Sequence, residues 1–387
     1  MPKDCIHLGH VEHRDVHNLY GYYHHKSTYL GHLARNSSDR PFVLSRAFFA
    51  GSQKWGAMWT GDNTALWEHL EYSVPMLLSS GVAGFPFAGA DIGGFFDNPT
   101  AGLLVRWYQV AAWQPFFRGH AHIDTKRREP WLFGEPYVTH IRNAVRRRYQ
   151  YLPYLYTAFH EAAVSGVPVM RPLFFEFPDD ESLFSEDSQF LVGPSILVKP
   201  VVSQDCEALA VRLPGKEPWY DIESRFSYAG SQLINVPTPM DKIPVFLKGG
   251  SIVVTQERLR RSSAMMKNDP YTLTVALNRN GEASGSLYID DGKSFDYKNG
   301  LFKKSDLRFS NGVLSGTIID GSFACTNLIE RIVVLGLSKP ATFSVSVTHP
   351  KPSPLTIISS ENPSVLTVRK PLVSICQDFK IVFAQSK

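Results

Sequence analysis

The chain has few cysteines, no long apolar run and no hydrophobic signal core. Its 387 residues include only four cysteines, widely scattered and without a Cys-x-x-Cys pair. They predict neither a zinc site nor a disulfide framework, and they leave the cellular compartment open. No apolar run approaches the roughly 18 residues that a membrane span requires. Residues 1–8 also contain no hydrophobic signal core.

An excess of charge of one sign is also lacking. The net charge of +4 is small for this length and gives no argument for a nucleic-acid partner. We interpret the two basic runs, Arg146–Arg148 and Arg258–Arg261, as solvated faces rather than phosphate-binding stripes. A chain of this length exceeds the usual size of one hydrophobic core, so we expect two or three domains.

Residues 1 to about 170 alternate strand-like and helix-like segments, which is typical of βαβ units. The pattern predicts strands over 41–46, 55–60, 82–88 and 114–118. It predicts helices from Asn63 to Leu78, over 103–112 and, as the longest, over 140–165.

From about residue 172 the sequence pattern changes. Short segments in which apolar and polar residues alternate are separated by Pro, Gly and Asp. This pattern indicates antiparallel β-structure in a sandwich. A stretch near 252–270 has the composition of a link to a second β-domain. That second domain contains strand-like segments over 271–278, 285–289 and 329–337.

Four of the strand-like segments end in a turn that carries an ionisable or aromatic side chain. A parallel strand delivers a catalytic group to the carboxyl-end rim of a barrel in this way. The four segments are Phe42-Val-Leu-Ser-Arg46, Trp59-Thr-Gly-Asp62-Asn63, Gly89-Ala-Asp91-Ile-Gly-Gly-Phe95 and Trp113-Gln-Pro-Phe-Phe-Arg-Gly-His120.

The order and spacing of these motifs resemble glycoside hydrolase family 31, the retaining α-glucosidases. The resemblance is strongest to the members that remove glucose from N-glycans in the endoplasmic reticulum. It implies an α/β plus all-β protein: the C-terminal half of a (β/α)8 TIM barrel followed by two β-sandwich domains. The barrel half would span residues 1–171, the proximal β-sandwich 172–254 and the distal β-sandwich 255–387.

By this resemblance Asp62 is the catalytic acid/base of the glycosidase. The physical interpretation agrees, because an aspartate in a turn after Trp59 can lose solvent to the indole ring. Loss of solvent favours the neutral form that donates a proton. An isolated Gly-Asp-Asn is more often a turn with a helix N-cap, and the surrounding motifs reverse that preference.

The resemblance assigns substrate binding to Arg46, Trp59, Phe95 and His120. Arg46 can also form a structural ion pair with Asp91, and His120 can be a hydrogen-bonded core histidine. We interpret Asp91 as a residue that does not touch the sugar and that orients Arg46 or its own turn.

The sequence departs from the family pattern at one decisive place. A retaining glycosidase needs a second carboxyl group as nucleophile, about 5–5.5 Å from the acid. The family carries it in a Trp-x-Asp-Met-Asn-Glu-Pro segment, and residues 1–61 contain nothing similar. We therefore expect an α-glucosidase of which this chain is a C-terminal portion. The alternatives are a non-catalytic carbohydrate-binding remnant and a cytosolic α-glucosidase of the maltase type.

We expect no metal and no cofactor. Five histidines lie within residues 10–25, with His13 and His17 at helical spacing, but no fixed third ligand accompanies them. The segment Asp290-Asp-Gly292 has too few ligands for calcium and is more typical of a hairpin turn.

The resemblance also implies partners and a location. The expected partners are an oligosaccharide substrate and a non-covalent regulatory β-subunit, with neither nucleic acid nor a membrane span. The expected location is the lumen of the endoplasmic reticulum. Asn36-Ser-Ser38 fits the acceptor pattern for N-glycosylation, which applies only to a protein that enters the secretory pathway.

Overall fold

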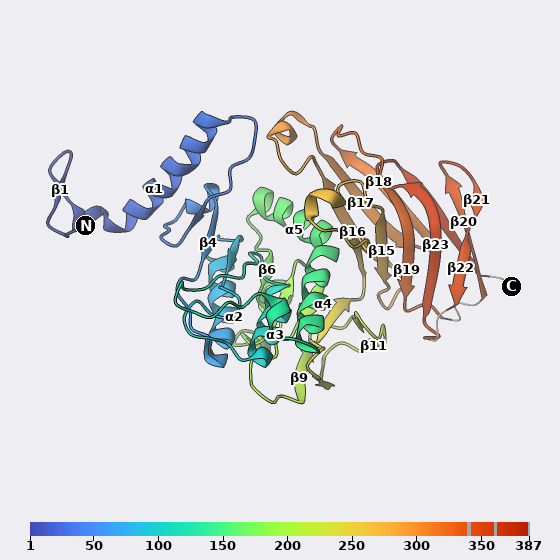
Figure 1. Cartoon of the computed structure of the whole chain (residues 1–387). Coiled ribbons are helices and arrows are strands. Elements are labelled where there is room, and N and C mark those ends of the chain that lie inside the picture. Colours follow the sequence, from blue (N-terminus) through green and yellow to red (C-terminus); the bar gives the residue numbers. More distant parts are fainter. Residues whose placement is uncertain (339–341, 360–361, 386–387) are drawn as a thin grey trace.

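A computed structural model describes residues 1–338, 342–359 and 362–385. Helix α1 (His13–Arg35) lies at one side of the molecule, a helix-rich part follows, and a large sheet lies at the other side (Figure 1). Within the described ranges, no helix is long and apolar enough to cross a membrane. The distal domain expected over 255–387 reaches residues 386–387, which lie outside the described ranges.

Three short parallel strands carry the first three predicted motifs. They are β3 (Leu44–Ser45), β4 (Ala57–Trp59) and β5 (Ala88–Gly89), paired in this order. The first two strands are confirmed in shorter form than predicted. The third was placed too early, because the preceding helix continues to Val82.

The fourth predicted strand, 114–118, does not form a regular β-strand. Its segment still lies beside β5, because the backbone N–H of Phe116 donates to the carbonyl of Ala88 over 3.0 Å. An isolated parallel bridge joins Ile92 to Gly119. The fourth motif therefore follows the other three in parallel alignment, although its hydrogen bonds are too few for a ladder.

Each of the two helices that follow the strands buries apolar side chains. The first shares a cluster with Met58 and Ala88 of the strands, and the second shares a cluster with Ile92 and Ile141. These helices are α2 (Trp67–Val82) and α3 (Ala101–Ala111). Helix α2 begins four residues later than predicted, because Asn63 belongs to the turn after β4. Helix α3 begins with the Thr100 hydroxyl accepting from the N–H of Leu103, a standard N-cap.

The single long helix predicted over 140–165 is wrong. The segment forms α4 (Tyr137–Gln150) and α5 (Leu152–Ser165), which meet at Tyr151. Pro153 explains the break, because proline has no N–H to donate and its ring clashes with the carbonyl four residues earlier. Helix α5 ends at Gly166, whose φ of 80° is the left-handed conformation that glycine adopts at a helix end.

Helix α1 and the small hairpin before it, β1 (Ile6–His7) and β2 (Val11–Glu12), were not predicted. The buried residues of α1 are His13 and His25, so the apolar periodicity that usually marks a helix is missing. A Cβ added at Gly21 would lie 2.4 Å from the Cβ of Ala47. The helix therefore packs closely against the segment that follows β3.

The middle of the chain forms a six-stranded sheet and a separate two-stranded ribbon. The ribbon pairs β9 (Ala208–Leu213) with β12 (Gln232–Pro237). Short helix α6 (Leu173–Glu176) lies between the first two strands of the sheet in sequence. In spatial order, the sheet contains β11 (Ser227–Tyr228), β10 (Trp219–Asp221), β13 (Val245–Lys248), β8 (Ile196–Val198), β7 (Phe190–Val192) and β6 (Met170–Arg171).

The remaining described strands form one eleven-stranded sheet. In chain order they are β14 (Ser251–Thr255), β15 (Tyr271–Ala276), β16 (Ala283–Ile289), β17 (Lys303–Ser310), β18 (Val313–Asp320), β19 (Leu328–Leu335), β20 (Phe343–His349), β21 (Ser353–Pro354), β22 (Thr356–Ser359), β23 (Val365–Ser374) and β24 (Phe379–Gln385). The predicted strands over 271–278, 285–289 and 329–337 are confirmed. The link expected near 252–270 is corrected in part, because β14 is a strand of this sheet.

Strands far apart in this sheet share one core. Leu273, Val368 and Ile381 belong to a single buried apolar cluster, although β23 and β24 lie near opposite ends of the strand order. The sheet must therefore bend until its two halves face each other, as in a sandwich. The domain boundaries at 171 and 254 stay predictions.

A polar network connects the helix-rich part to the large sheet. Arg40 donates to the hydroxyl of Tyr156 on α5 at 2.9 Å and pairs with Asp290 at 3.2 Å. The Tyr156 hydroxyl also donates to Asp290 at 2.6 Å. The Asp290-Asp-Gly292 segment begins the connection 290–302 between the antiparallel strands β16 and β17, so it lies in a hairpin loop but does not form a tight two-residue turn.

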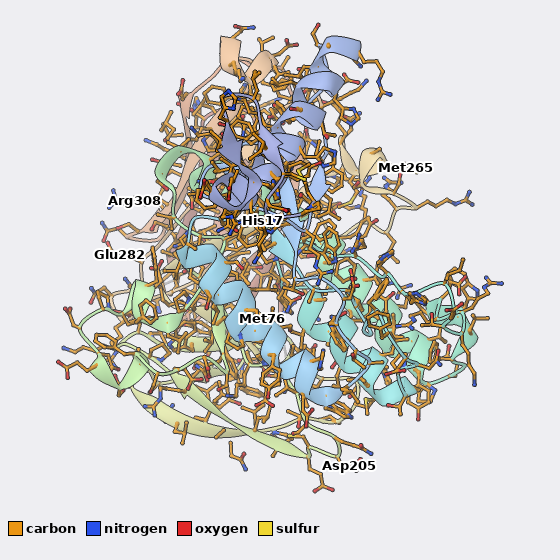
Figure 2. The ribbon with its side chains drawn as sticks, turned by 90° about the vertical axis from the view of Figure 1, so that its left-hand side faces the viewer. His17, Met76, Asp205, Met265, Glu282 and Arg308 are labelled. Atoms are coloured by element: carbon orange, nitrogen blue, oxygen red, sulfur yellow. A yellow bond between two sulfur atoms is a disulfide. The ribbon has the colours of Figure 1, made fainter. Side chains whose placement is uncertain are left out.

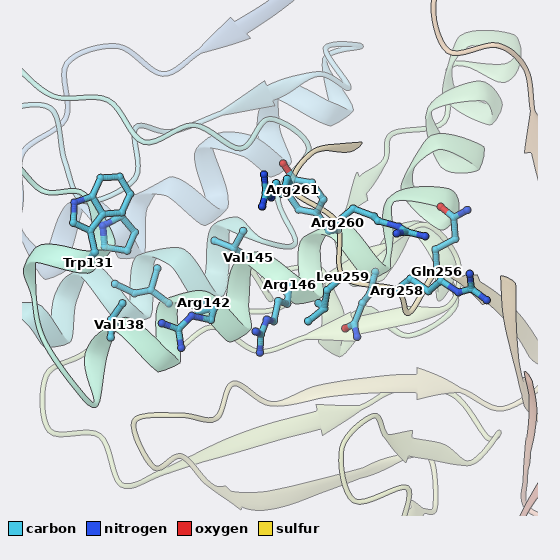
Figure 3. Close-up of a pocket in the computed structure, with 14 residues that line it drawn as sticks. Trp131, Val138, Arg142, Val145, Arg146, Gln256, Arg258, Leu259, Arg260 and Arg261 are labelled. Atoms are coloured by element: carbon cyan, nitrogen blue, oxygen red, sulfur yellow. The ribbon is translucent and has the colours of Figure 1, made fainter. Parts of the chain in front are cut away.

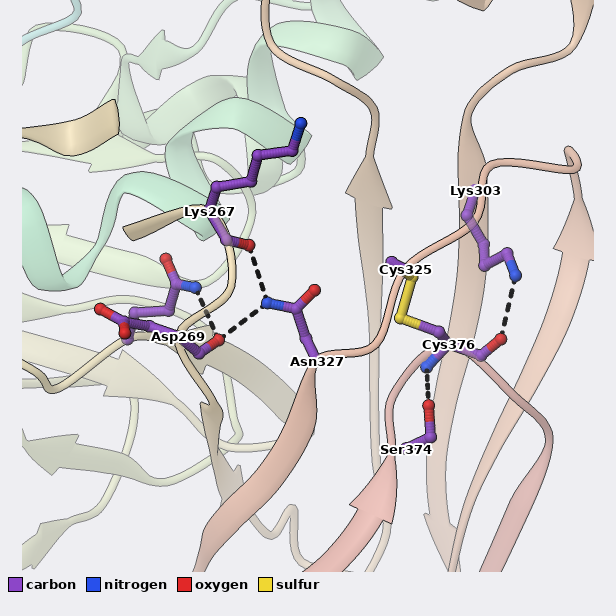
Figure 4. The surroundings of a disulfide bond; sticks show 8 residues. Lys267, Asp269, Lys303, Cys325, Asn327, Ser374 and Cys376 are labelled. Atoms are coloured by element: carbon purple, nitrogen blue, oxygen red, sulfur yellow. Dashed lines mark hydrogen bonds between the residues drawn. A yellow bond between two sulfur atoms is a disulfide. The ribbon is translucent and has the colours of Figure 1, made fainter. Parts of the chain in front are cut away.

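The cysteines form one disulfide, although the sequence predicted no disulfide framework. Cys325 and Cys376 are bonded, with their Cα atoms 5.9 Å apart (Figure 4). Their separation of 51 residues gives no local spacing signal, so the sequence alone could not reveal the pair. Cys5 and Cys206 remain free thiols.

The disulfide should stabilise the large sheet. Replacing Cys325 and Cys376 together by serine is expected to lower the free energy of unfolding of this region by about 2–4 kcal/mol, because the open chain gains conformational entropy. Urea unfolding under non-reducing conditions measures the change, with Cys206→Ser as the control. An unchanged midpoint in the double variant would contradict the assignment.

Candidate active site

The four predicted motifs meet at one edge of the parallel strands. Arg46 follows β3 directly, Asp62 lies three residues after β4, and Asp91 lies two residues after β5. Arg118 precedes the bridging Gly119 in the fourth segment. Because all four segments run in the same direction, their carboxyl ends gather these charged side chains at one rim.

Arg46 and Asp62 form an ion pair across the first two strand ends. Arg46 Nη1 lies 3.6 Å from Asp62 Oδ2, and the two side chains are 60% and 36% exposed. Gly61 permits this approach, because a Cβ there would lie 2.6 Å from Arg46 Nε and its φ is 92°. The exclusion of solvent by Trp59 that the sequence predicted is therefore incomplete in this structure.

Asp91 does not pair with Arg46, which corrects one of the two predicted arrangements. Its partner is Arg118, which donates from Nε at 3.1 Å and from Nη2 at 2.5 Å to Asp91 Oδ1. The Asp91 side chain is buried, and this burial raises the pKa of its carboxyl group, while Arg118 acts in the opposite direction. Arg118 lies within the fourth motif, but the sequence pattern predicted no role for it.

Asn63 was also missed, and it joins two of the turns. Its side-chain amide donates to the carbonyl of Asp91 at 3.1 Å, and its side-chain oxygen accepts from the N–H of Phe95 at 2.9 Å. The Asn63 carbonyl accepts from the N–H groups of Phe95 and Phe96. The residue next to Asp62 therefore fixes the turn after β5.

Aromatic side chains surround this rim. Phe95 stacks on His120, with ring centroids 5.4 Å apart, so two predicted substrate-binding residues are in contact. His122, which was not predicted, lies at 5.4 Å from both Phe95 and Phe96. Trp59 presents its ring to the Arg118 guanidinium at 5.2 Å. Trp59 thus stabilises the partner of Asp91 as well as forming part of the rim.

A second unpredicted arginine supports the turn that presents Phe95. Arg128 donates to the carbonyls of Gly93, Gly94 and Asp97. Gly94 has a φ of 83°, and a Cβ there would lie 2.3 Å from the backbone nitrogen of Ala65. Only glycine lets the turn lie this close to the segment after β4.

An open hollow of about 610 Å³ lies beside Arg46 and Trp59. Met58 of β4 and Tyr72 and Met76 of α2 also line it. Figure 2 shows Met76 on the outer side of α2. Asp62, Phe95 and His120 do not line this hollow, so the described residues do not enclose all the predicted site residues in one pocket.

The histidines near the amino terminus interact with each other. His13 is within hydrogen-bond distance of His7 at 2.9 Å and of His17 at 2.8 Å. In the described parts of the chain, no group of three or more His, Cys, Asp or Glu residues is arranged to hold a metal ion.

Of the two aspartates at the ends of β4 and β5, only Asp62 is accessible for proton transfer. Asp62 is partly exposed beside Arg46, whereas Asp91 is buried and paired with Arg118. Asp91 is therefore unsuited to be the second carboxyl group of a retaining glycosidase, which must reach the sugar.

Comparison with known proteins identifies the family. The model of the glycosyl hydrolases family 31 TIM-barrel domain matches residues 1–158, and the model of the family 31 C-terminal domain matches residues 166–253. The chain belongs to glycosyl hydrolase family 31.

Two similar proteins are named as alpha-glucosidases. The chain is 51% identical to a probable glucan 1,3-alpha-glucosidase of Arabidopsis thaliana, over 98% of this chain and 43% of that protein. It is 50% identical to neutral alpha-glucosidase AB of Dictyostelium discoideum, over 98% of this chain and 41% of that protein. The chain thus spans about two fifths of the length of these relatives.

A solved structure is similar over nearly the whole chain. It is the crystal structure of a heterodimeric endoplasmic-reticulum glucosidase II complex of the catalytic subunit and the binding domain of the regulatory subunit. The TM-score is 0.95 and the identity 43%, over 99% of this chain and 44% of that chain.

The pair of Asp91 and Arg118 should contribute to stability. Asp91→Ala is expected to lower the free energy of unfolding by about 2–3 kcal/mol, because it leaves Arg118 unpaired. The loss should be smaller than for a fully buried pair, since water reaches the Arg118 side chain, which is 26% exposed. Urea unfolding followed by tryptophan fluorescence measures it. Asp306→Ala, at an exposed position on β17, is the control; equal midpoints for the two variants would refute the prediction.

Proposed function

We propose that this chain carries the acid/base and part of the sugar-binding surface of a retaining α-glucosidase. The observation that carries the proposal is the position of Asp62. It is a partly exposed carboxyl group at a parallel strand end, beside Arg46, in a chain of glycosyl hydrolase family 31. The names of the relatives support α-glucosidase activity.

The chemistry assigns two roles to Asp62. As a neutral carboxyl group it protonates the departing oxygen, and as a carboxylate it then accepts a proton from the attacking water. Arg46 lies 3.6 Å from Asp62, where it can pair with the carboxylate of the second step. Its exposed guanidinium can also donate to a sugar hydroxyl.

The nucleophile is assigned to a part of the barrel that this chain does not contain. Three strands and two bridges cannot close a barrel of eight strands. The buried pair of Asp91 with Arg118 supports this assignment, because it removes Asp91 as a candidate.

Trp59, Phe95 and His120 are proposed to bind the sugar. A sugar ring presents flat C–H faces to an aromatic ring, and an imidazole nitrogen can hydrogen-bond a hydroxyl group. The stacked pair of Phe95 and His120 supplies both kinds of contact at adjacent positions.

The proposed substrate is α-1,3-linked glucose at the end of an N-glycan. The name of the Arabidopsis relative, a probable glucan 1,3-alpha-glucosidase, supports the linkage. Similarity to a glucosidase II alpha subunit solved in a Glc1Man2-bound form supports the N-glycan. A maltase-type substrate is the second candidate. Parallel assays with maltose and with an α-1,3-linked glucose disaccharide distinguish the two candidates.

A chimera tests the catalytic proposal. This chain replaces the part of the Dictyostelium relative that it matches, and the relative supplies the remaining length. Asp62→Asn in this chimera is expected to lower kcat/KM for an α-1,3-linked glucose disaccharide by about 10²–10⁴-fold. For an activated aryl α-glucoside the loss should be much smaller, since its leaving group departs without a proton.

The control for this experiment is Asp306→Asn, which changes an exposed aspartate on the large sheet and should leave both rates unchanged. Equal losses on the two substrates would remove Asp62 from the acid role. A folded chimera that binds maltose and hydrolyses neither substrate would favour the non-catalytic remnant.

We also propose a luminal location and a regulatory partner. The disulfide between Cys325 and Cys376 supports an oxidising compartment. The solved complex of a catalytic subunit with a regulatory binding domain supports a non-covalent β-subunit. Asn36 lies exposed at the end of α1, where an oligosaccharide transferase could reach it.

Glycosylation tests whether Asn36 accepts a glycan in the lumen, as a luminal protein requires of an accessible acceptor. The chimera expressed in eukaryotic cells with a secretory signal is expected to show an endoglycosidase-sensitive mobility shift that Asn36→Gln reduces by one glycan. Fractionation of the natural full-length protein complements the test. A cytosolic protein that co-purifies with no second subunit would reject the location and the partner together.

A further inference from the structure

The two basic runs of the sequence meet at one pocket. Arg142 and Arg146 project from α4, and Arg258, Arg260 and Arg261 come from the segment after β14. Figure 3 shows these two elements side by side, with Trp131 at one end of the lining residues and Arg258 at the other. Arg146 and the run Arg258–Arg261 are exposed, as the sequence predicted, whereas Arg148 is buried.

The pocket combines positive charge with an apolar lining. Its volume is about 360 Å³, within the range of ligand-binding sites. Val138, Val145 and Leu259 contribute aliphatic surface, and the Trp131 side chain is 66% exposed. None of the described residues that line the pocket is acidic.

Two of the five arginines already have carboxylate partners. Arg258 pairs with Glu330 at 3.1 Å, and Arg260 pairs with the buried Asp269 at 2.5 Å. Arg142, Arg146 and Arg261 form no ion pair within the described ranges. The pocket therefore keeps an excess of positive charge that its own surroundings do not neutralise.

The segment after β14 is held in place, so the pocket is formed before any ligand arrives. The buried side chain of Gln256 donates to the carbonyls of Met266 and Asp269, both at 3.0 Å. The Gln256 N–H donates to the carbonyl of Gln150 at the end of α4. A preformed site avoids part of the entropy cost of binding.

We propose that this pocket, the arginine pocket, binds an acidic peptide segment of a partner protein, with an aromatic or leucine side chain of that segment in the pocket. Carboxylates pair with the planar guanidinium groups of Arg142, Arg146 and Arg261. The apolar side chain covers Leu259 and packs against Trp131. A phosphate ion alone would leave this apolar lining exposed to water, so the lining favours a peptide.

The proposal is independent of the assigned catalytic role of Asp62. Tryptophan and arginine are the residues most enriched at the energetic centres of protein interfaces, and this pocket combines them. Charge attraction also makes the proposed binding sensitive to salt.

Fluorescence anisotropy with the full 387-residue chain tests the proposal. The probe is a labelled synthetic peptide, Glu-Asp-Trp-Glu-Glu-Leu, and the comparison peptide has glutamine and asparagine in place of the acids. The acidic peptide is expected to bind at least tenfold more tightly than the neutral one. The double variant R142Q and R146Q should lose at least tenfold in affinity for the acidic peptide. Trp131→Ala should weaken binding of the acidic peptide and leave that of an all-glutamate peptide unchanged.

The matched control is the double variant R308Q and R369Q, which removes two exposed arginines of the large sheet and changes the net charge equally. This control should bind the acidic peptide as tightly as the unchanged chain does. Non-specific adhesion of the peptide to exposed apolar surface would instead give the same affinity for all variants. Equal losses in the two double variants would overturn the proposal. Displacement of the peptide by inorganic phosphate at equal concentration would overturn it in favour of a small-anion site.

Discussion

The hydrogen bonds of Asn63 are the interaction on which the candidate active site depends. Through one side-chain amide, the turn after β4 is joined to the carbonyl of Asp91 and to the N–H of Phe95. Asp62 precedes this residue directly, so its position is fixed relative to the aromatic rim. The close approach also requires Gly61 and Gly94, because a side chain at either position would collide with its neighbour.

The strand-end motifs were predictable because each couples an apolar strand to a polar turn, and parallel strands bring such turns together. Arg46, Asp62, Phe95 and His120 thus reach the same rim. The partner of Asp91 was not predictable, because Arg46 and Arg118 both suit a carboxylate and only the three-dimensional positions distinguish them. Helix α1 escaped prediction since it buries two histidines rather than an apolar stripe.

Burial divides the charged groups into two kinds. Asp91 and Asp290 are withdrawn from water and hold segments together through arginine and tyrosine partners. Asp62 and Arg46 stay accessible, and so do Arg142, Arg146 and Arg261 at the arginine pocket. The accessible groups are the ones to which we assign ligands. The two proposed sites lie on different elements. The sugar site lies at the ends of β3 and β4, and the peptide site lies between α4 and the segment after β14.

The central claim is that Asp62 transfers protons and that the nucleophile lies outside this chain. Labelling the chimera with 5-fluoro-α-D-glucosyl fluoride tests the position of the nucleophile most directly. This reagent traps the covalent glycosyl-enzyme of retaining α-glucosidases. Peptide mapping by mass spectrometry then locates the label. We predict one labelled carboxylate, within the part supplied by the relative. A label on Asp62 or Asp91 would contradict this prediction.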